Sequence, residues 1–192
     1  MDARAVDRDT FGRFDAVASL GAFEHFCSPE VHRAGRQDEV YRDFFARVAG
    51  VLPDGGRLYL QTMVFGRHMI PIDTVSIQAS PGSDARYLAL LQHQFPGSLL
   101  PFGSEQVIRA AEPFFSLVES SNGRLDYIET IKHWRARFAK RSPRKTLIKA
   151  GLIPRYLTSR EFRLAFTSGV SANSVCFERE LLDHFRLVFE KL

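Results

Sequence analysis

The spacing of apolar residues divides the first third of the chain into a strand, a helix and a second strand. Residues 14–20 are a short, mostly apolar run, which predicts a buried strand. Residues 36–52 place their apolar side chains at helical spacing, and Pro53-Asp54-Gly55-Gly56 then ends the helix with a turn. Residues 57–64 predict the next strand. This order predicts a βαβ unit with parallel strands and a right-handed crossover.

The rest of the chain mixes helical patterns with weaker strand patterns. Helical spacing recurs in four segments: 84–93, 104–111, 125–138 and 181–189. Two short runs predict strands: 115–121 and 174–178. The sequence Thr158-Ser159-Arg160-Glu161 has the spacing of a capping box, which predicts a short helix through Phe166. We expect the chain to close on the helix at 181–189.

Composition restricts the class of protein. The 192 residues are 45% hydrophobic and 25% charged, which is typical of one globular domain and excludes a disordered tail or a collagen-like fibre. Cys27 and Cys176 cannot build a disulfide framework and indicate a reducing compartment. No apolar run approaches the ~18 residues of a membrane span, and the polar start does not resemble a signal peptide. We therefore expect a cytoplasmic protein, or one peripheral at the inner membrane surface.

Positive charge is concentrated in residues 124–163, which we call the basic segment. It holds 12 Lys/Arg against 3 Asp/Glu, whereas the rest of the chain holds 14 against 19. Such a segment indicates an anionic partner, although a solvated helix face explains it as well. No nucleic-acid module accompanies it, and its aromatic and aliphatic residues favour an anionic membrane surface. The six histidines show no metal-ligand spacing, so no metal site is expected.

One octapeptide points to a family. Ser19-Leu20-Gly21-Ala22-Phe23-Glu24-His25-Phe26 resembles the signature of the cyclopropane-fatty-acyl-phospholipid synthases, which include the mycolic acid cyclopropane synthases. Segments that resemble later parts of the same family follow in the expected order: 52–62, 95–101, 126–134 and 162–163. The resemblance covers nearly the whole chain and corresponds to the C-terminal part of the family.

The resemblance implies an α/β fold, a Rossmann-like methyltransferase sheet that lacks its first strands and carries inserted lipid-binding helices. It divides the single partial domain into a remaining βαβ core at 1–64, insertion helices with an intervening strand at 65–171, and a terminal strand and helix at 172–192. The implied cofactor is S-adenosylmethionine. Its methyl carbon moves to the double bond of an unsaturated acyl lipid, and a bound bicarbonate is the implied base that removes a proton from the resulting cation.

The resemblance also implies roles for particular residues. The catalytic candidates are Glu24, Tyr127 and Gln61, and the cofactor-binding candidates are Asp2, Ala3, Leu20 and Gly21. Glu24 corresponds to the glutamate at the family's bicarbonate site, and Gln61 stands where the family usually has histidine. The structural alternatives for Glu24 are a surface glutamate on a loop or a charge at the start of a helix. The alternative for Tyr127 is an ordinary tyrosine of an amphipathic helix. Five rings are candidates to shield the cation, with ordinary core packing as the alternative: Phe23, Phe26, Phe65, Phe95 and Phe102.

The main departure from the family concerns glycine. Methyltransferases of this kind carry E/D-x-G-x-G-x-G after their first strand, and this chain has no such motif. Without the strands that normally precede it, the strand at 14–20 is expected to form a bare sheet edge. An inactive remnant or a lipid-surface binding module is therefore the alternative to an enzyme. The oligomeric state is not predicted.

Overall fold

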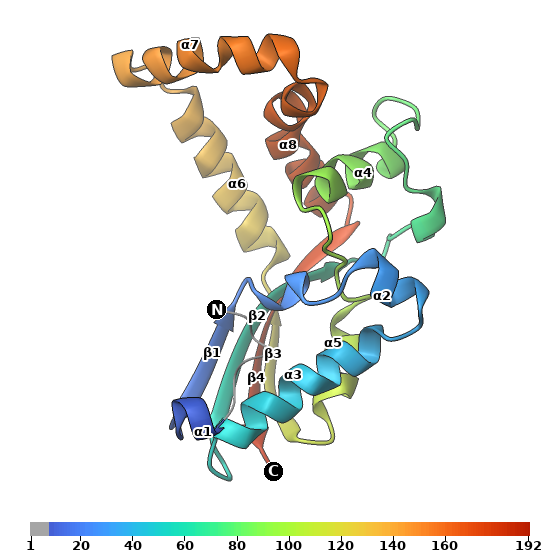
Figure 1. The fold of residues 1–192 in the computed structure, drawn as a ribbon, viewed down its shortest axis with the longest axis vertical. Helices are drawn as coiled ribbons and strands as arrows, with labels where there is room; N and C mark the ends of the chain where they lie inside the picture. The colour runs from blue at the N-terminus through green and yellow to red at the C-terminus, as the bar shows by residue number, and fades with distance from the viewer. Residues whose placement is uncertain (1–7) are drawn as a thin grey trace. The chain divides into compact units, whose positions relative to one another are not determined.

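A computed structural model describes residues 8–192, apart from the side chains of residues 8, 161, 164, 165 and 167–171. Four strands in this part of the chain form one mixed sheet (Figure 1). Their order across the sheet is β1 (Ala16–Leu20), β2 (Arg57–Phe65), β4 (Leu182–Lys191) and β3 (Phe115–Asn122). β1 is parallel to β2, whereas β4 is antiparallel to both β2 and β3.

The predicted βαβ unit is confirmed. Helix α3 (Gln37–Val51) connects β1 to β2, and a tight turn follows it at Pro53–Gly56. The Gly56 N–H donates to the Pro53 carbonyl at 2.9 Å. A Cβ atom on Gly56 would lie 2.7 Å from that carbonyl oxygen, so a side chain cannot be accommodated there without a backbone shift. The glycine therefore allows the chain to reverse directly into β2.

Aromatic rings fill the space between one face of the sheet and its helices. Helices α3 and α5 (Ser104–Ala111) lie on this face in Figure 1. Phe23 and Phe45 are fully buried there, and the Phe23 ring stacks on Tyr41 at 4.6 Å between centroids. Phe23 and Phe26 are therefore part of the core packing. The buried members of this core cluster are Phe23, Cys27, Tyr41, Phe44, Phe45, Val48, Ala49, Leu52, Leu58, Leu60, Val64, Val107, Ala110, Ala111, Phe115, Leu187 and Phe189.

β1 forms an edge of the described sheet, as expected, but its predicted burial is wrong. Ala16, Ala18 and Leu20 are exposed, while Val17 and Ser19 are half-buried. The strand pairs only with β2. Alternate residues of a strand point to opposite faces, and the described helices α3 and α5 pack on one face only. An apolar run without polar alternation therefore does not guarantee a buried strand.

The described chain divides into two compact units. Of the described residues, the first contains 8–67, 97–124 and 182–192, and the second contains 68–96 and 125–181. The first unit holds the sheet, with α1 (Arg8–Phe11), η2 (Phe23–His25), α2 (Pro29–Arg33), α3 and α5. The second is helical: η3 (Ile72–Thr74), α4 (Asp84–Gln94), α6 (Arg124–Ala139), α7 (Pro143–Thr158) and α8 (Arg160–Glu178). No described helix combines the length and apolar character needed to cross a bilayer.

Three predictions for the last part of the chain are wrong. Residues 174–178 end helix α8 and do not form a strand, whereas residues 182–191 form β4 and not a helix. The terminal strand and helix expected over 172–192 are thus reversed in order. The cap of α8 is Ser159, which accepts from the Phe162 N–H at 3.1 Å, and the helix continues well past Phe166.

Tertiary packing explains the exchange of strand and helix. The apolar residues of 181–189 fit helical spacing, and short apolar runs are ambiguous between the two periods. β4 lies between β2 and β3, so its backbone hydrogen-bonds on both sides. In α8, Ala172, Cys176 and Phe177 are buried, and the helix packs on α4. These long-range contacts decide both elements.

Candidate functional site

The end of β1 brings three of the candidate residues together. Leu20 is the last residue of the strand and is exposed, and Gly21 follows it with φ +63°. The Gly21 N–H donates to the Gln61 carbonyl at 3.0 Å, which extends the pairing with β2 by one residue. The chain then turns into η2, which carries Glu24. This corner lies at the carboxyl end of two parallel strands, where open α/β sheets bind their ligands.

Glu24 is a buried carboxylate, with 4% of its surface exposed. The Thr62 hydroxyl, on the adjacent strand β2, lies 3.1 Å from Glu24 Oε2 and 3.0 Å from the Met63 carbonyl. Burial raises the pKa of Glu24, although hydrogen bonds from backbone N–H groups and from Thr62 oppose that rise. The surface alternative for Glu24 is therefore wrong, because the side chain is held inside the unit. A buried carboxyl with a raised pKa is a candidate for proton transfer.

The raised pKa predicts how stability depends on pH. The folded state binds the Glu24 proton more tightly than the unfolded state, so this contribution is complete below the usual value of 4.5 and is lost as pH rises through the raised pKa. Glu24→Gln removes this dependence, because the amide does not ionise. Urea unfolding at several pH values should show the variant gaining stability relative to the unmodified chain above pH 4.5. The control is Glu112→Gln, at an exposed position. If the free energy of unfolding depends on pH in the same way for both variants, the prediction is contradicted.

Gln61 has a histidine partner that sequence reasoning missed. Its Nε2 lies 3.0 Å from Nε2 of His184, a residue of β4 that is only 4% exposed. The two side chains share one face of the sheet, because Gln61 pairs with Arg186 and Met63 pairs with His184. Where the family usually has histidine, this chain thus places a glutamine amide against an imidazole. The wrong helix prediction for 181–189 hid this pair, since only the strand register brings it together.

Tyr127 lies in the second unit, on α6. Its ring centroid is 4.7 Å from that of Phe177 and 6.1 Å from that of Trp134. Gln61 and Glu24 both belong to the first unit, but Gln61 lies on the face of β2 opposite to Thr62, which contacts Glu24. The catalytic roles of Gln61, Glu24 and Tyr127 therefore stay predictions. The tyrosine packs within an aromatic cluster, as the structural alternative expects.

Two of the four cofactor candidates have a described position at the end of β1. Asp2 and Ala3 lie outside the described residues, so only Leu20 and Gly21 have a described position. A Cβ on Gly21 would lie 3.5 Å from Glu24 Oε1, an ordinary contact, so no cradle there requires glycine for lack of space. Gly21 is the one glycine with positive φ that directly follows a described strand. The roles of Leu20 and Gly21 in cofactor binding therefore stay predictions.

Both cysteines are buried thiols. Burial raises the pKa of Cys27 to about 11 and that of Cys176 to about 12. Because the thiolate is the reactive form, neither residue is prepared to act as a nucleophile. No cluster of potential metal ligands occurs among the described residues.

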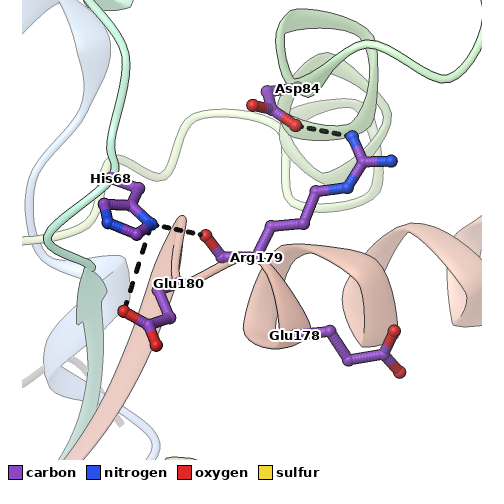
Figure 2. A pocket seen from close by; sticks show the side chains of 5 residues that line it. All are labelled: His68, Asp84, Glu178, Arg179 and Glu180. Carbon is purple, nitrogen blue, oxygen red and sulfur yellow. Dashed lines mark hydrogen bonds and ion pairs between the residues drawn. The ribbon is translucent and has the colours of Figure 1, made fainter.

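A charged pocket of about 570 Å³ lies in the second unit (Figure 2). Arg179 donates to Asp84 Oδ1 at 2.7 Å, and His68 Nδ1 lies 3.2 Å from the Arg179 carbonyl and 4.0 Å from Glu180 Oε2. Figure 2 shows the Glu178 side chain directed away from the other four residues. The ion pair joins the start of α4 to the end of α8.

Glu180 ends α8 in an unusual conformation. Its φ is +58°, a value that favours glycine, and its N–H donates to Phe177 while the Leu181 N–H donates to Cys176. These two bonds form a Schellman motif, in which glycine is the usual residue at this position. The motif ends α8 shortly before β4 begins at Leu182.

Known proteins resemble the chain in sequence and in fold. Residues 4–182 match the family described as mycolic acid cyclopropane synthetase. Hydroxymycolate synthase MmaA4 of Mycobacterium tuberculosis is 29% identical over 121 residues, which are 62% of this chain and 36% of that protein. The chain thus spans little more than a third of the length of this curated relative.

Two solved structures share the fold. The cyclopropane synthase MmaA2 of Mycobacterium tuberculosis superposes with a TM-score of 0.67 at 21% identity, over 95% of this chain and 57% of the other. Mycolic acid cyclopropane synthase CmaA1, solved with SAH and CTAB, superposes with a TM-score of 0.65 at 22% identity, over 93% and 56%. The predicted Rossmann-like α/β fold is therefore confirmed.

Proposed function

This chain belongs to the mycolic acid cyclopropane synthetase family, and we propose that it supplies part of an S-adenosylmethionine-dependent methyltransferase that acts on unsaturated acyl lipids. The family match over residues 4–182 carries the proposal and confirms the resemblance of residues 19–26. CmaA1 was solved with SAH, the form that remains when S-adenosylmethionine has lost its methyl group. The finer proposal is methyl or methylene transfer to the double bond of the acyl chain.

The corner at the end of β1 supports a role in handling a proton. A carboxylate beside a second anion needs a shared proton, because two negative charges at hydrogen-bond distance repel. Burial raises the pKa of Glu24 and thereby favours its protonated form, which can donate to an oxygen of bicarbonate. Thr62 holds the other side of the carboxyl group. We propose that Glu24 positions a bound bicarbonate. Gln61, which contacts His184 on the opposite face of β2, remains a further catalytic candidate.

A chimera tests the function. The chimera consists of the N-terminal segment of MmaA2, up to the start of its similarity to this chain, followed by residues 4–192 of this chain. It is assayed with labelled S-adenosylmethionine and an unsaturated acyl lipid. We expect transfer of label by the chimera, whereas calorimetry of the 192-residue chain alone should show no binding at millimolar cofactor. Micromolar affinity of the chain alone contradicts this expectation. A folded chimera that binds cofactor but never labels lipid favours the alternative, a lipid-surface binding module without turnover.

A further inference from the structure

Helix α7 turns an apolar stripe toward solvent. Five residues spaced at four, three, four and three positions lie on one side of the helix, and we call them the outer stripe: Pro143, Leu147, Ala150, Pro154 and Leu157. All five are exposed, with Leu147 at 74% and Leu157 at 68%. An amphipathic helix in a globular protein normally turns such a stripe toward the core. No residue of α7 is buried, so this helix does not use the stripe to pack its own unit.

The opposite side of α7 makes its contacts with the second unit. Leu152 and Tyr156 are half-buried, and with Ile153 they line an apolar groove of about 230 Å³ closed by Phe162 and Phe166. At the end of α7, Arg163 Nη1 donates to the Tyr156 carbonyl at 2.9 Å and to the Leu157 carbonyl at 2.7 Å. These contacts set the rotation of the helix and direct the outer stripe outward.

Lysine side chains fix the start of the same helix. Lys145 Nζ donates to the carbonyls of Arg137 and Lys140, at 2.6 and 2.9 Å, and so satisfies the carboxyl end of α6. Lys149 Nζ lies 5.4 Å from the centroid of the Phe138 ring. Figure 1 shows α7 running across the ends of α6 and α8. Its outer stripe is therefore the outward surface at this end of the second unit.

The charge around the stripe identifies its partner. Residues 130–160 contain ten Lys/Arg and no Asp or Glu. Arg141, Arg144 and Arg155 are all exposed. A helix with an apolar stripe and cationic surroundings lies in the plane of an anionic membrane, with the stripe in the acyl boundary and the charges among the headgroups. We propose that α7 docks the protein on an anionic lipid surface by inserting its outer stripe. An acidic protein would also match the charge, and binding to vesicles of pure lipid distinguishes the two partners.

Vesicle sedimentation with the 192-residue chain tests the proposal. Binding to phosphatidylglycerol vesicles should exceed binding to phosphatidylcholine vesicles at least about tenfold, and should weaken with salt as the Debye length falls below ~10 Å. The pair Leu147→Gln and Leu157→Gln changes no charge and should lower this binding about tenfold. Leu192→Gln is the matched control, because Leu192 is 66% exposed and lies outside the helix; it should bind as the unmodified chain does.

A fluorescence measurement separates insertion from surface adsorption. The chain has a single tryptophan, so Trp134→Phe gives a silent background for Leu147→Trp or Leu152→Trp. With anionic vesicles that contain brominated acyl chains, the probe at 147 should be quenched and the probe at 152 should not. Equal quenching of both probes, equal binding to neutral vesicles, or unchanged binding of the double glutamine variant overturns the proposal. Vesicle binding requires no turnover, so its outcome is independent of the proposed enzymatic function.

Discussion

In the MmaA2 chimera, Glu24→Gln should lower the turnover number about 100-fold and leave cofactor affinity unchanged. General acid–base groups typically contribute ~10²–10⁴-fold, and the lower end applies because bicarbonate, and not Glu24, removes the proton in the proposed scheme. The amide keeps the size of the side chain and one oxygen that accepts from Thr62. The amide cannot ionise or release a proton, so the variant tests only the contribution of proton exchange by the Glu24 carboxyl group.

Two comparisons make this result specific. Glu112 is exposed in the first unit, so Glu112→Gln should leave the turnover number unchanged. The rate profile against pH should lose one limb in Glu24→Gln, because the raised pKa of the carboxyl no longer contributes. A purely structural glutamate would lower the folded fraction and leave the shape of the profile intact. An unchanged turnover number in a folded variant removes Glu24 from the mechanism.

Phe45→Ala should destabilise the chain by about 3–5 kcal/mol, which is a large part of the ~5–15 kcal/mol that stabilises a typical domain. Phe45 is fully buried. Its ring centroid lies 5.7 Å from Phe23, 5.5 Å from Phe189 on β4 and 6.0 Å from Phe115 on β3. One side chain thus ties α3 to two strands, and its removal leaves a cavity that the surrounding rings cannot close.

Urea unfolding followed by circular dichroism measures this effect. Phe14→Ala is the matched control, because the Phe14 ring is 43% exposed and its loss should cost less than about 1 kcal/mol. Phe45→Leu keeps most of the apolar volume and should fall between the two. Equal costs for Phe45→Ala and Phe14→Ala would show that the aromatic cluster is not the core of the first unit.

The sequence pattern correctly predicted those elements in which the apolar residues recur at a single spacing. Helix α3 has one buried face, so its apolar residues recur at a single spacing and its bounds of 37–51 fall close to the predicted 36–52. The turn at Pro53–Gly56 could be predicted because the steric constraint that requires glycine there involves only neighbouring residues. Glu24 was found by resemblance, since the octapeptide around it is contiguous in the chain.

The structure alone revealed the partners that lie far apart in the chain. Glu24 was a catalytic candidate with a surface position as one alternative, and the fold showed that it is buried with Thr62 against its carboxyl group. The six histidines show no metal-ligand spacing in the sequence, so nothing singled out His184. Only the register of β2 with β4 places it beside Gln61. Such pairs depend on which strands meet and in which register, and no local spacing encodes that choice.

Patterns contiguous in the chain were therefore enough to predict the family, the βαβ unit and the place of Glu24 after β1. Tertiary structure decided that β4 is a strand, that β1 is exposed, and that α7 turns its outer stripe to solvent. The physical reason is the range of the forces involved. Capping, turns and helical periodicity act within a few residues, whereas burial depends on what the rest of the chain brings to each face. An apolar side chain favours burial, but the tertiary fold determines whether another element covers it.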